Sequence, residues 1–212
     1  MRPVVAVPVG SCEQHGPHLP LCTDTLVAVA LAEALGRHRR DVVVAPTVGI
    51  SASGEHAGFP GTLSIGTDVL ARSLTELVRS ARAWARAVVV VSAHGGNADA
   101  LARVSATAAD EGDVVVVHTP HVPDGDAHAG RTETALVLVL APALVRHNDA
   151  VAGPSTPLPE LIGRLRDEGV AAVSPSGVLG DPAGASAEEG RQILAALCED
   201  LCRAVDEALG PA

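Results

Sequence analysis

The sequence predicts an α/β fold, a three-layer α/β/α sandwich around a mostly parallel central sheet. Four short runs of the chain are rich in valine and almost continuously apolar, which is typical of strands buried on both faces. Amphipathic stretches of helical length separate these runs, and such alternation implies right-handed crossovers between parallel strands. The chain has 212 residues, 47% of them hydrophobic, which suffices for one continuous core. We therefore expect residues 1–212 to form a single domain.

The expected elements follow one another along the chain. The strands lie where β-branched residues cluster, at residues 4–9, 42–45, 88–92 and 114–118. The connecting helices lie where apolar residues recur with helical spacing, at 26–39, 68–85 and 98–111. A last helix begins at Ser186, which forms a capping box with Glu189, and runs toward Leu209.

Segments rich in glycine, proline or serine interrupt this alternation. They span residues 46–66, 120–130 and 148–184, the last around a short helix near 158–168. Long ordered loops in a compact domain usually have a function. The first carries Glu55 and His56, and for both residues substrate contact and simple anchoring of the loop remain open. The second carries His128.

The composition argues against several kinds of partner. The net charge is −10 and lysine is absent, whereas a nucleic-acid-binding protein usually has a basic stripe. We expect no membrane partner either, because no apolar run reaches the roughly 20 residues that cross a bilayer. The first residues lack the pattern of a signal peptide, so a cytoplasmic protein is expected.

Polar residues directly follow the predicted strands. Glu13 and His15 come after the first strand, His94 after the third, and His128 and Glu133 after the fourth. Ligands of open parallel sheets bind beyond the carboxyl ends of the strands. We therefore expect these side chains to converge on one edge of the sheet.

The converging residues have the chemistry of metal ligands. Carboxylates and imidazoles bind zinc, iron(II) or manganese(II), and Asp24, just before the next predicted helix, adds a further carboxylate. Five ligands are too many for one catalytic metal that keeps an open position, but they suit two metals with a shared carboxylate. The alternative for Asp24 alone is that it caps the helix.

Two glycines follow His94. Gly95 and Gly96 allow a ligand to approach the backbone closely, and their N–H groups would suit an anionic oxygen of a substrate. A tight turn between strand and helix also needs glycine, so the two interpretations stand together.

Five blocks of the chain resemble, in order, the signatures of the creatininase family. They are residues 10–20 (GSCEQHGPHLP) with Thr23 and Asp24, 54–56 (GEH) with 59–64 (FPGTLS), 92–97 (SAHGGN), 126–130 (DAHAG) with Glu133 and Thr134, and 180–182 (GDP) with 187–190 (AEEG). The resemblance covers nearly the whole chain. One departure is Cys22, which stands where family members usually have an aspartate, so a thiol replaces a carboxylate that would hydrogen-bond around the ligands.

The resemblance implies a metal-dependent hydrolase of amide or peptide bonds that forms homo-oligomers. It implies one metal held by Glu13, Asp24 and His94, and a second held by His15, Asp24 and Glu133. It also implies that His128 shuttles protons. Within the family, the opening block and the short chain look most like peptidases that trim a modified ribosomal peptide precursor.

Two other functions remain open at this point. The first is a small-molecule amidohydrolase that hydrolyses a cyclic amide or a formamide with the same metal chemistry. The second is a non-catalytic scaffold that has kept the fold, and the intact set of five ligands argues against it.

Overall fold

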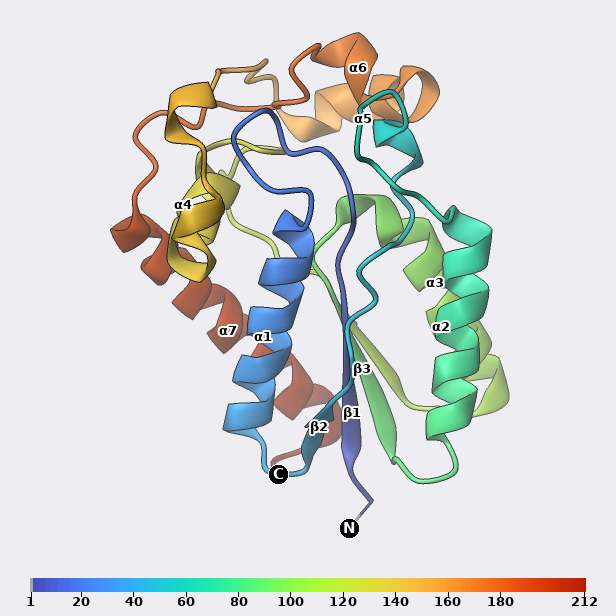
Figure 1. Ribbon diagram of the computed structural model, residues 1–212. Coiled ribbons are helices and arrows are strands. Elements are labelled where there is room, and N and C mark those ends of the chain that lie inside the picture. Colours follow the sequence, from blue (N-terminus) through green and yellow to red (C-terminus); the bar gives the residue numbers. More distant parts are fainter. Residues whose placement is uncertain (1) are drawn as a thin grey trace.

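A four-stranded parallel sheet forms the middle of the molecule (Figure 1). The structure is a computed structural model of the chain and describes residues 2–212. The strand order is β2-β1-β3-β4. The strands are β1 (Val4–Val9), β2 (Val42–Val44), β3 (Ala87–Ser92) and β4 (Val115–His118).

Helices cover both faces of this sheet, which confirms the predicted three layers (Figure 1). One face carries α1 (Thr23–His38), α4 (Arg131–Leu140) and α7 (Ala187–Leu209). The other carries α2 (Thr67–Ala81) and α3 (Ala98–Glu111). Alternate residues of β1 serve the two cores, because successive side chains of a strand point to opposite faces: Val4 and Ala6 pack toward α1 and α7, and Val5 and Val7 toward α2 and α3.

The central and outer strands differ in burial. Every residue of β1 and β3 is buried, as expected for strands covered on both faces. The outer strands β2 and β4 are only partly buried, and Val43 is 48% exposed. The prediction of burial on both faces is therefore correct for the central pair and wrong for the outer pair, which lie at the edges of the sheet.

Several boundaries differ from those predicted. Helix α1 begins at Thr23, so Asp24 lies inside its first turn and not before it. Helix α4 was not predicted at all. Its sequence ends in an alternating run of leucine and valine that does not distinguish a helix from a strand. This segment forms a helix because it packs against α1 and α7. The contact with α7 is so close at Gly190 that a Cβ added to this glycine would lie 2.0 Å from the carbonyl oxygen of Ala135.

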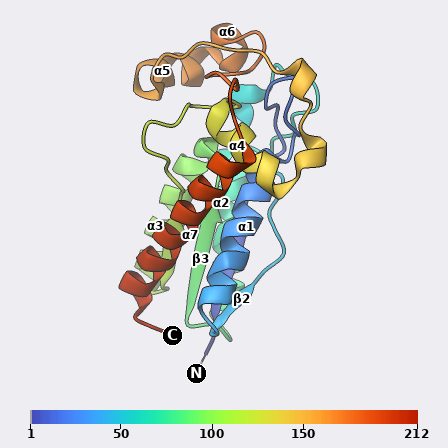
Figure 2. The ribbon, with the colours of Figure 1, turned by 90° about the vertical axis from the view of Figure 1, so that its left-hand side faces the viewer.

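The carboxyl end of the sheet is covered by a separate group of short elements (Figure 2). They are α5 (Leu158–Glu168), α6 (Val170–Val173) and the 3-10 turn η1 (Gly54–His56). Leu161, Leu165 and Val170 form a small apolar cluster there, with Phe59 packed against it. The long loop 46–66 is thereby held over the edge where the predicted site lies.

The order of the strands also marks this edge. The chain passes from β1 outward to β2 and returns to β3 on the other side of β1. The connection that follows β1 leads to one side of the sheet, and the connection that follows β3 leads to the other side. Ligands of open α/β sheets bind at such a point between two strands. Among residues 2–212, no helix is long and apolar enough to cross a membrane.

Candidate metal centre

Five side chains predicted as metal ligands meet beyond the ends of β1 and β3. Glu13 and His15 lie in the segment that follows β1, and both are fully buried. His94 comes two residues after the end of β3. Asp24 and Glu133 lie in the first turns of α1 and α4. The structure thus brings together residues that are up to 120 positions apart in the sequence.

The atoms that would bind metal face one another. His94 Nδ1 lies 3.1 Å from Glu13 Oε1 and 3.4 Å from Asp24 Oδ2. His15 Nε2 lies 3.3 Å from Asp24 Oδ1 and 3.8 Å from Glu133 Oε2. Asp24 therefore presents one oxygen to each histidine. Within each of two triads, Glu13–Asp24–His94 and His15–Asp24–Glu133, the ligand atoms lie within 4.8 Å of one another.

The carboxylate of Glu13 provides a test of whether a cation fits. Both of its oxygens are buried, and within residues 2–212 neither accepts a hydrogen bond. A buried charge without a partner is costly, whereas coordination of a cation would satisfy both oxygens. The donor set of carboxylates and imidazoles is also the one that zinc, iron(II) and manganese(II) prefer. The residues present fit a pair of divalent cations.

The protonation equilibria show the same surplus of negative charge. Burial alone would lower the pKa of His15, but Asp24, Glu133 and Glu13 outweigh burial and raise this pKa to about 10. Burial, together with the charges of Asp24 and Glu13, raises the pKa of Glu133 to about 7 against the opposing effect of His15. Protons would thus compete with a cation for this cluster, and metal binding would release them.

The first turn of helix α4 fixes the position of Glu133. The carboxylate of Asp126 accepts hydrogen bonds from the backbone N–H groups of Arg131 and Thr132 and so caps this helix. The N–H of Ala129 donates to Glu133 Oε2 at 2.6 Å. Asp126 is therefore a structural residue that fixes the first turn of α4.

His128 lies against the same cluster. Its ring centroid is 4.3 Å from that of His15, and the residue is 8% exposed. Its Nε2 lies 2.8 Å from the backbone oxygen of Gln14. A carbonyl oxygen only accepts, so Nε2 carries a proton and Nδ1 is the nitrogen left for proton exchange. Glu13, His15 and His128 also form a third triad with ligand atoms within 4.8 Å, which the sequence did not suggest.

The predicted substrate contacts fall into two groups. His56 is only 4% exposed and its Nε2 lies 3.4 Å from Glu13 Oε1, which favours an anchoring role. Glu55 is partly exposed, and its Oε1 lies 3.4 Å from His94 Nε2. Gly95 is exposed and Gly96 partly buried, directly after His94. Glu55 and the two glycines are thus the members of this set that reach the surface.

Gln14 and Cys22 are two other residues close in sequence to the predicted ligands. Gln14 was not predicted, yet it is buried with its side chain against His56 and His128. The sequence feature that could have pointed to Gln14 is its position between the predicted ligands Glu13 and His15. Cys22 precedes α1, and the three triads found in the described part of the chain do not include it.

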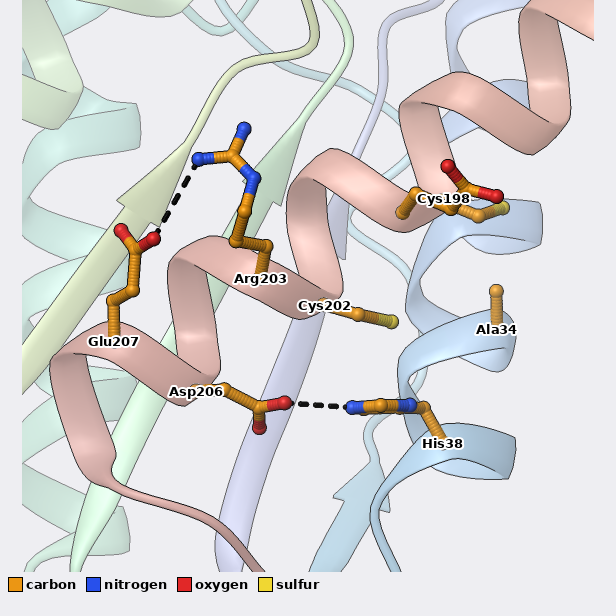
Figure 3. A pocket seen from close by; sticks show the side chains of 8 residues that line it. Ala34, His38, Cys198, Cys202, Arg203, Asp206 and Glu207 are labelled. Atoms are coloured by element: carbon orange, nitrogen blue, oxygen red, sulfur yellow. Dashed lines mark hydrogen bonds and ion pairs between the residues drawn. The ribbon is translucent and has the colours of Figure 1, made fainter.

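A surface groove of about 620 Å³ lies away from this cluster, between α1 and α7 (Figure 3). It is lined by side chains that include Ala34, His38, Cys198 and Cys202. His38 is the last residue of α1, whereas Asp24 lies in its first turn, so the groove and the metal centre are at opposite ends of this helix.

Comparison with known proteins gives a consistent family. The family model of creatininase, described as creatinine amidohydrolase, matches residues 1–205. The mycofactocin precursor peptide peptidase of Mycolicibacterium smegmatis is 52% identical over 200 residues, which are 92% of this chain and 81% of that protein. Its namesake from Mycobacterium tuberculosis H37Rv is 47% identical over 212 residues, 96% of this chain and 84% of that protein. Creatinine amidohydrolase of Pseudomonas putida is 28% identical over 240 residues, 98% of this chain and 90% of that protein.

Solved structures agree with this fold. A mutant creatininase superposes with a TM-score of 0.85 at 26% identity, over 99% of this chain and 92% of that chain. A second mutant creatininase, described as the Zn-Zn type, has a TM-score of 0.81 at 25% identity over the same shares. A structure named creatininase Mn has a TM-score of 0.77 at 26% identity, again over 99% and 92%.

Proposed function

The chain belongs to the creatininase family, and from this premise we propose that it is a metal-dependent peptidase that removes a short C-terminal peptide from the modified mycofactocin precursor. Membership places it among hydrolases of carbon–nitrogen amide bonds. The substrate follows the name shared by relatives of 52% and 47% identity, whereas the creatinine amidohydrolase is 28% identical. The observation that carries the chemistry is the convergence of two ligand triads on Asp24.

The proposed centre holds two divalent cations per subunit, of zinc, iron(II) or manganese(II). Glu13, Asp24 and His94 would hold one, and His15, Asp24 and Glu133 the other. Two related structures, one described as the Zn-Zn type and one named creatininase Mn, support these choices. When bound, the cations would lower the pKa of a water molecule and polarise the substrate carbonyl.

His128 would deliver the proton that the leaving nitrogen needs. Its Nε2 is engaged with the carbonyl of Gln14, so Nδ1 would take up a proton and pass it to the departing amine. Burial holds the pKa of His128 well below its usual 6.5. The ring therefore gives its proton up readily, which suits a group that must return to the neutral form in each cycle.

Glu55, Gly95 and Gly96 would contact the substrate. They lie beside His94, and Glu55 is 26% exposed, so this side of the centre meets solvent. The exposed N–H of Gly95 would suit a substrate oxygen. The carboxylate of Glu55 would suit a donor group of the peptide backbone.

The proposal includes a homo-oligomer in the cytoplasm. Large apolar side chains are exposed on several segments near the carboxyl end of the sheet, including Leu21, Leu63, Leu158 and Ile162. Burial of exposed apolar surface of this kind is what subunit contacts provide. Light scattering coupled to size-exclusion chromatography would measure the number of subunits.

The decisive experiment is a cleavage assay read by mass spectrometry. The enzyme loaded with each metal is given the modified mycofactocin precursor, creatinine or a formamide. We expect the precursor to lose a short C-terminal peptide, and creatinine and the formamide to remain intact. The enzyme whose metal has been removed by a chelator, and the variants His15→Ala and Asp24→Ala, should cleave none of the three. Turnover of creatinine or the formamide alone would support the small-molecule hydrolase. A folded protein that binds no metal and cleaves nothing would support a scaffold.

A further inference from the structure

The side chain of Gln14 lies at the centre of a buried hydrogen-bond network behind the metal centre. Gln14 is 5% exposed, and its amide nitrogen Nε2 lies 2.9 Å from His56 Nδ1, 3.1 Å from His128 Nε2 and 3.2 Å from the carbonyl oxygen of Gly177. An amide nitrogen has two hydrogens, so it can donate to only two of these three groups.

The orientation of the amide is fixed by its oxygen. The backbone N–H of Gly16 donates to Gln14 Oε1 at 2.8 Å, which excludes the flipped amide because an NH₂ group does not accept. Gly177 leaves the room that the amide needs: its φ is +80°, and an added Cβ would lie 1.8 Å from Gln14 Oε1. The Gln14 amide is thus held in one orientation from both sides.

The distribution of protons then follows from the partners. His128 Nε2 is already protonated, because it donates to the backbone oxygen of Gln14 at 2.8 Å. It therefore does not accept from the Gln14 amide, whose two hydrogens go to Gly177 and to His56 Nδ1. A neutral imidazole that accepts at Nδ1 carries its hydrogen at Nε2. His56 Nε2 lies 3.4 Å from Glu13 Oε1, so this hydrogen is on the side of the carboxylate.

We infer that Gln14 and His56 act in series as positioning residues for Glu13, and this inference rests on the proposed metal centre. Gln14 sets the tautomer of His56, and His56 keeps the hydrogen of Nε2 beside one oxygen of Glu13, in a polar contact of 3.4 Å that is not a hydrogen bond. Both oxygens of the carboxylate thus stay free to bind a cation. Partners of this kind around metal ligands commonly change metal affinity by about 10–100-fold when they are removed. Apart from the peptide bond between Gln14 and His15, the side chains of Gln14 and His56 make none of the contacts given above with the second triad, His15–Asp24–Glu133.

The test measures metal affinity, not turnover. Competition titration with a chromogenic chelator gives the two zinc affinities of the wild type, Gln14→Met and His56→Phe. Both variants keep the size of the side chain and remove its hydrogen bonds. Gln192→Met and His121→Phe are matched controls on exposed positions. The Co²⁺-loaded proteins give an absorption spectrum that reports the geometry of the ligands.

We expect each variant to weaken one of the two sites about 10–100-fold and to change its cobalt spectrum, while both controls behave as the wild type. The double variant Gln14→Met/His56→Phe should bind no more weakly than His56→Phe, because residues in series lose the same interaction once. General loosening of the core would instead give losses that add and affect both sites.

The outcomes separate this inference from the proposed function. A wild type that binds no metal overturns the proposed function. A second outcome is that the wild type binds two zinc ions while the folded variants keep its zinc affinity, or lose affinity by amounts that add in the double variant. Either result overturns the positioning series from Gln14 through His56 to Glu13 and leaves the proposed function intact. If His56→Phe does not fold by circular dichroism, Gln14→Met alone decides: unchanged zinc affinity refutes the role of Gln14.

Discussion

Gly96 offers a sharp test of how closely the metal centre is packed. An added Cβ at this position would lie 2.1 Å from Glu55 Oε1, 2.4 Å from His94 Nε2 and 2.8 Å from the backbone oxygen of Ala52. The carboxylate of Glu55 is the end of a flexible side chain and can move away. The ring of His94 is less free to move, because its Nε2 is hydrogen-bonded to the same Ala52 oxygen at 3.0 Å.

The size of the effect of Gly96→Ala follows from these distances. Ordinary contact with a Cβ begins at 3.4 Å, so the ring of His94 must retreat by about 1.0 Å. A displacement of about 1 Å in a catalytic group costs on the order of 100-fold in rate. Forcing an extra methyl group into a packed region also costs about 1–3 kcal/mol of stability. We expect kcat/KM to fall about 100-fold and the cation held by His94 to bind more weakly.

Gly95→Ala is the matched control for metal binding and stability. In the described part of the chain, an added Cβ at Gly95 meets nothing within 4 Å. The control should keep the zinc content and the melting temperature of the wild type, while its KM reports whether the substrate comes close to Gly95. Peptide cleavage kinetics, zinc content by mass spectrometry and thermal melting make the comparison. A Gly96→Ala enzyme with wild-type zinc affinity and kcat/KM would refute this reasoning.

Four further predictions concern stability, pH, metal removal and catalysis. Arg39→Met should lower the free energy of unfolding by about 2 kcal/mol, less than the roughly 3–5 of a fully buried pair, because Arg86 still pairs with Asp41 and His38 with the partly exposed Asp206. Urea titration measures this change. Hydrogen bonds from Arg39 and Arg86 lower the pKa of the Asp41 carboxyl below 3.8, and hydrogen bonds from His38 (Figure 3) and Arg39 do the same for Asp206. The stabilisation by these pairs is therefore complete above pH 3.8 and is lost as the pH falls further. Acid melting curves of the wild type should therefore drop more steeply below pH 3.8 than those of Arg39→Met, and parallel curves would contradict the linkage. Removal of metal by a chelator should lower the melting temperature, by the equivalent of about 4 kcal/mol at a metal concentration 1,000 times Kd, and an unchanged temperature would argue against a metal centre. His128→Asn should keep both metals and lose about 10²–10⁴-fold in kcat, whereas a wild-type kcat would remove His128 from the mechanism.

The sequence was sufficient to predict the three layers and the positions of the four strands along the chain. Apolar runs such as 4–9 and 88–92 are local patterns, and local patterns determine which segments become buried strands. The polar residues that follow those runs, Glu13, His15 and His94, could be placed on one edge because parallel strands share their carboxyl ends. Their role as ligands stays a prediction until metal is measured.

Other features depend on contacts between distant segments. The sequence of α4 does not distinguish a helix from a strand, and packing against α7 at Gly190 determines that this segment is helical. Arg39 looks like one of several cations at a helix end, yet it is fully buried and joins Asp41 to Asp206 near the other end of the chain. No local pattern predicts such a partner, because 165 positions separate Asp41 from Asp206.

The sequence alone therefore determined the fold class and the set of donor groups, since both are written in short runs of residues and their spacing. Only the tertiary structure decided which nitrogen of His128 and of His56 bears a proton, which glycine has room for a methyl group, and that Glu13 has unsatisfied oxygens. These are properties of distances between side chains from separate elements. Packing fixes such distances to fractions of an ångström, and a one-dimensional pattern does not contain them.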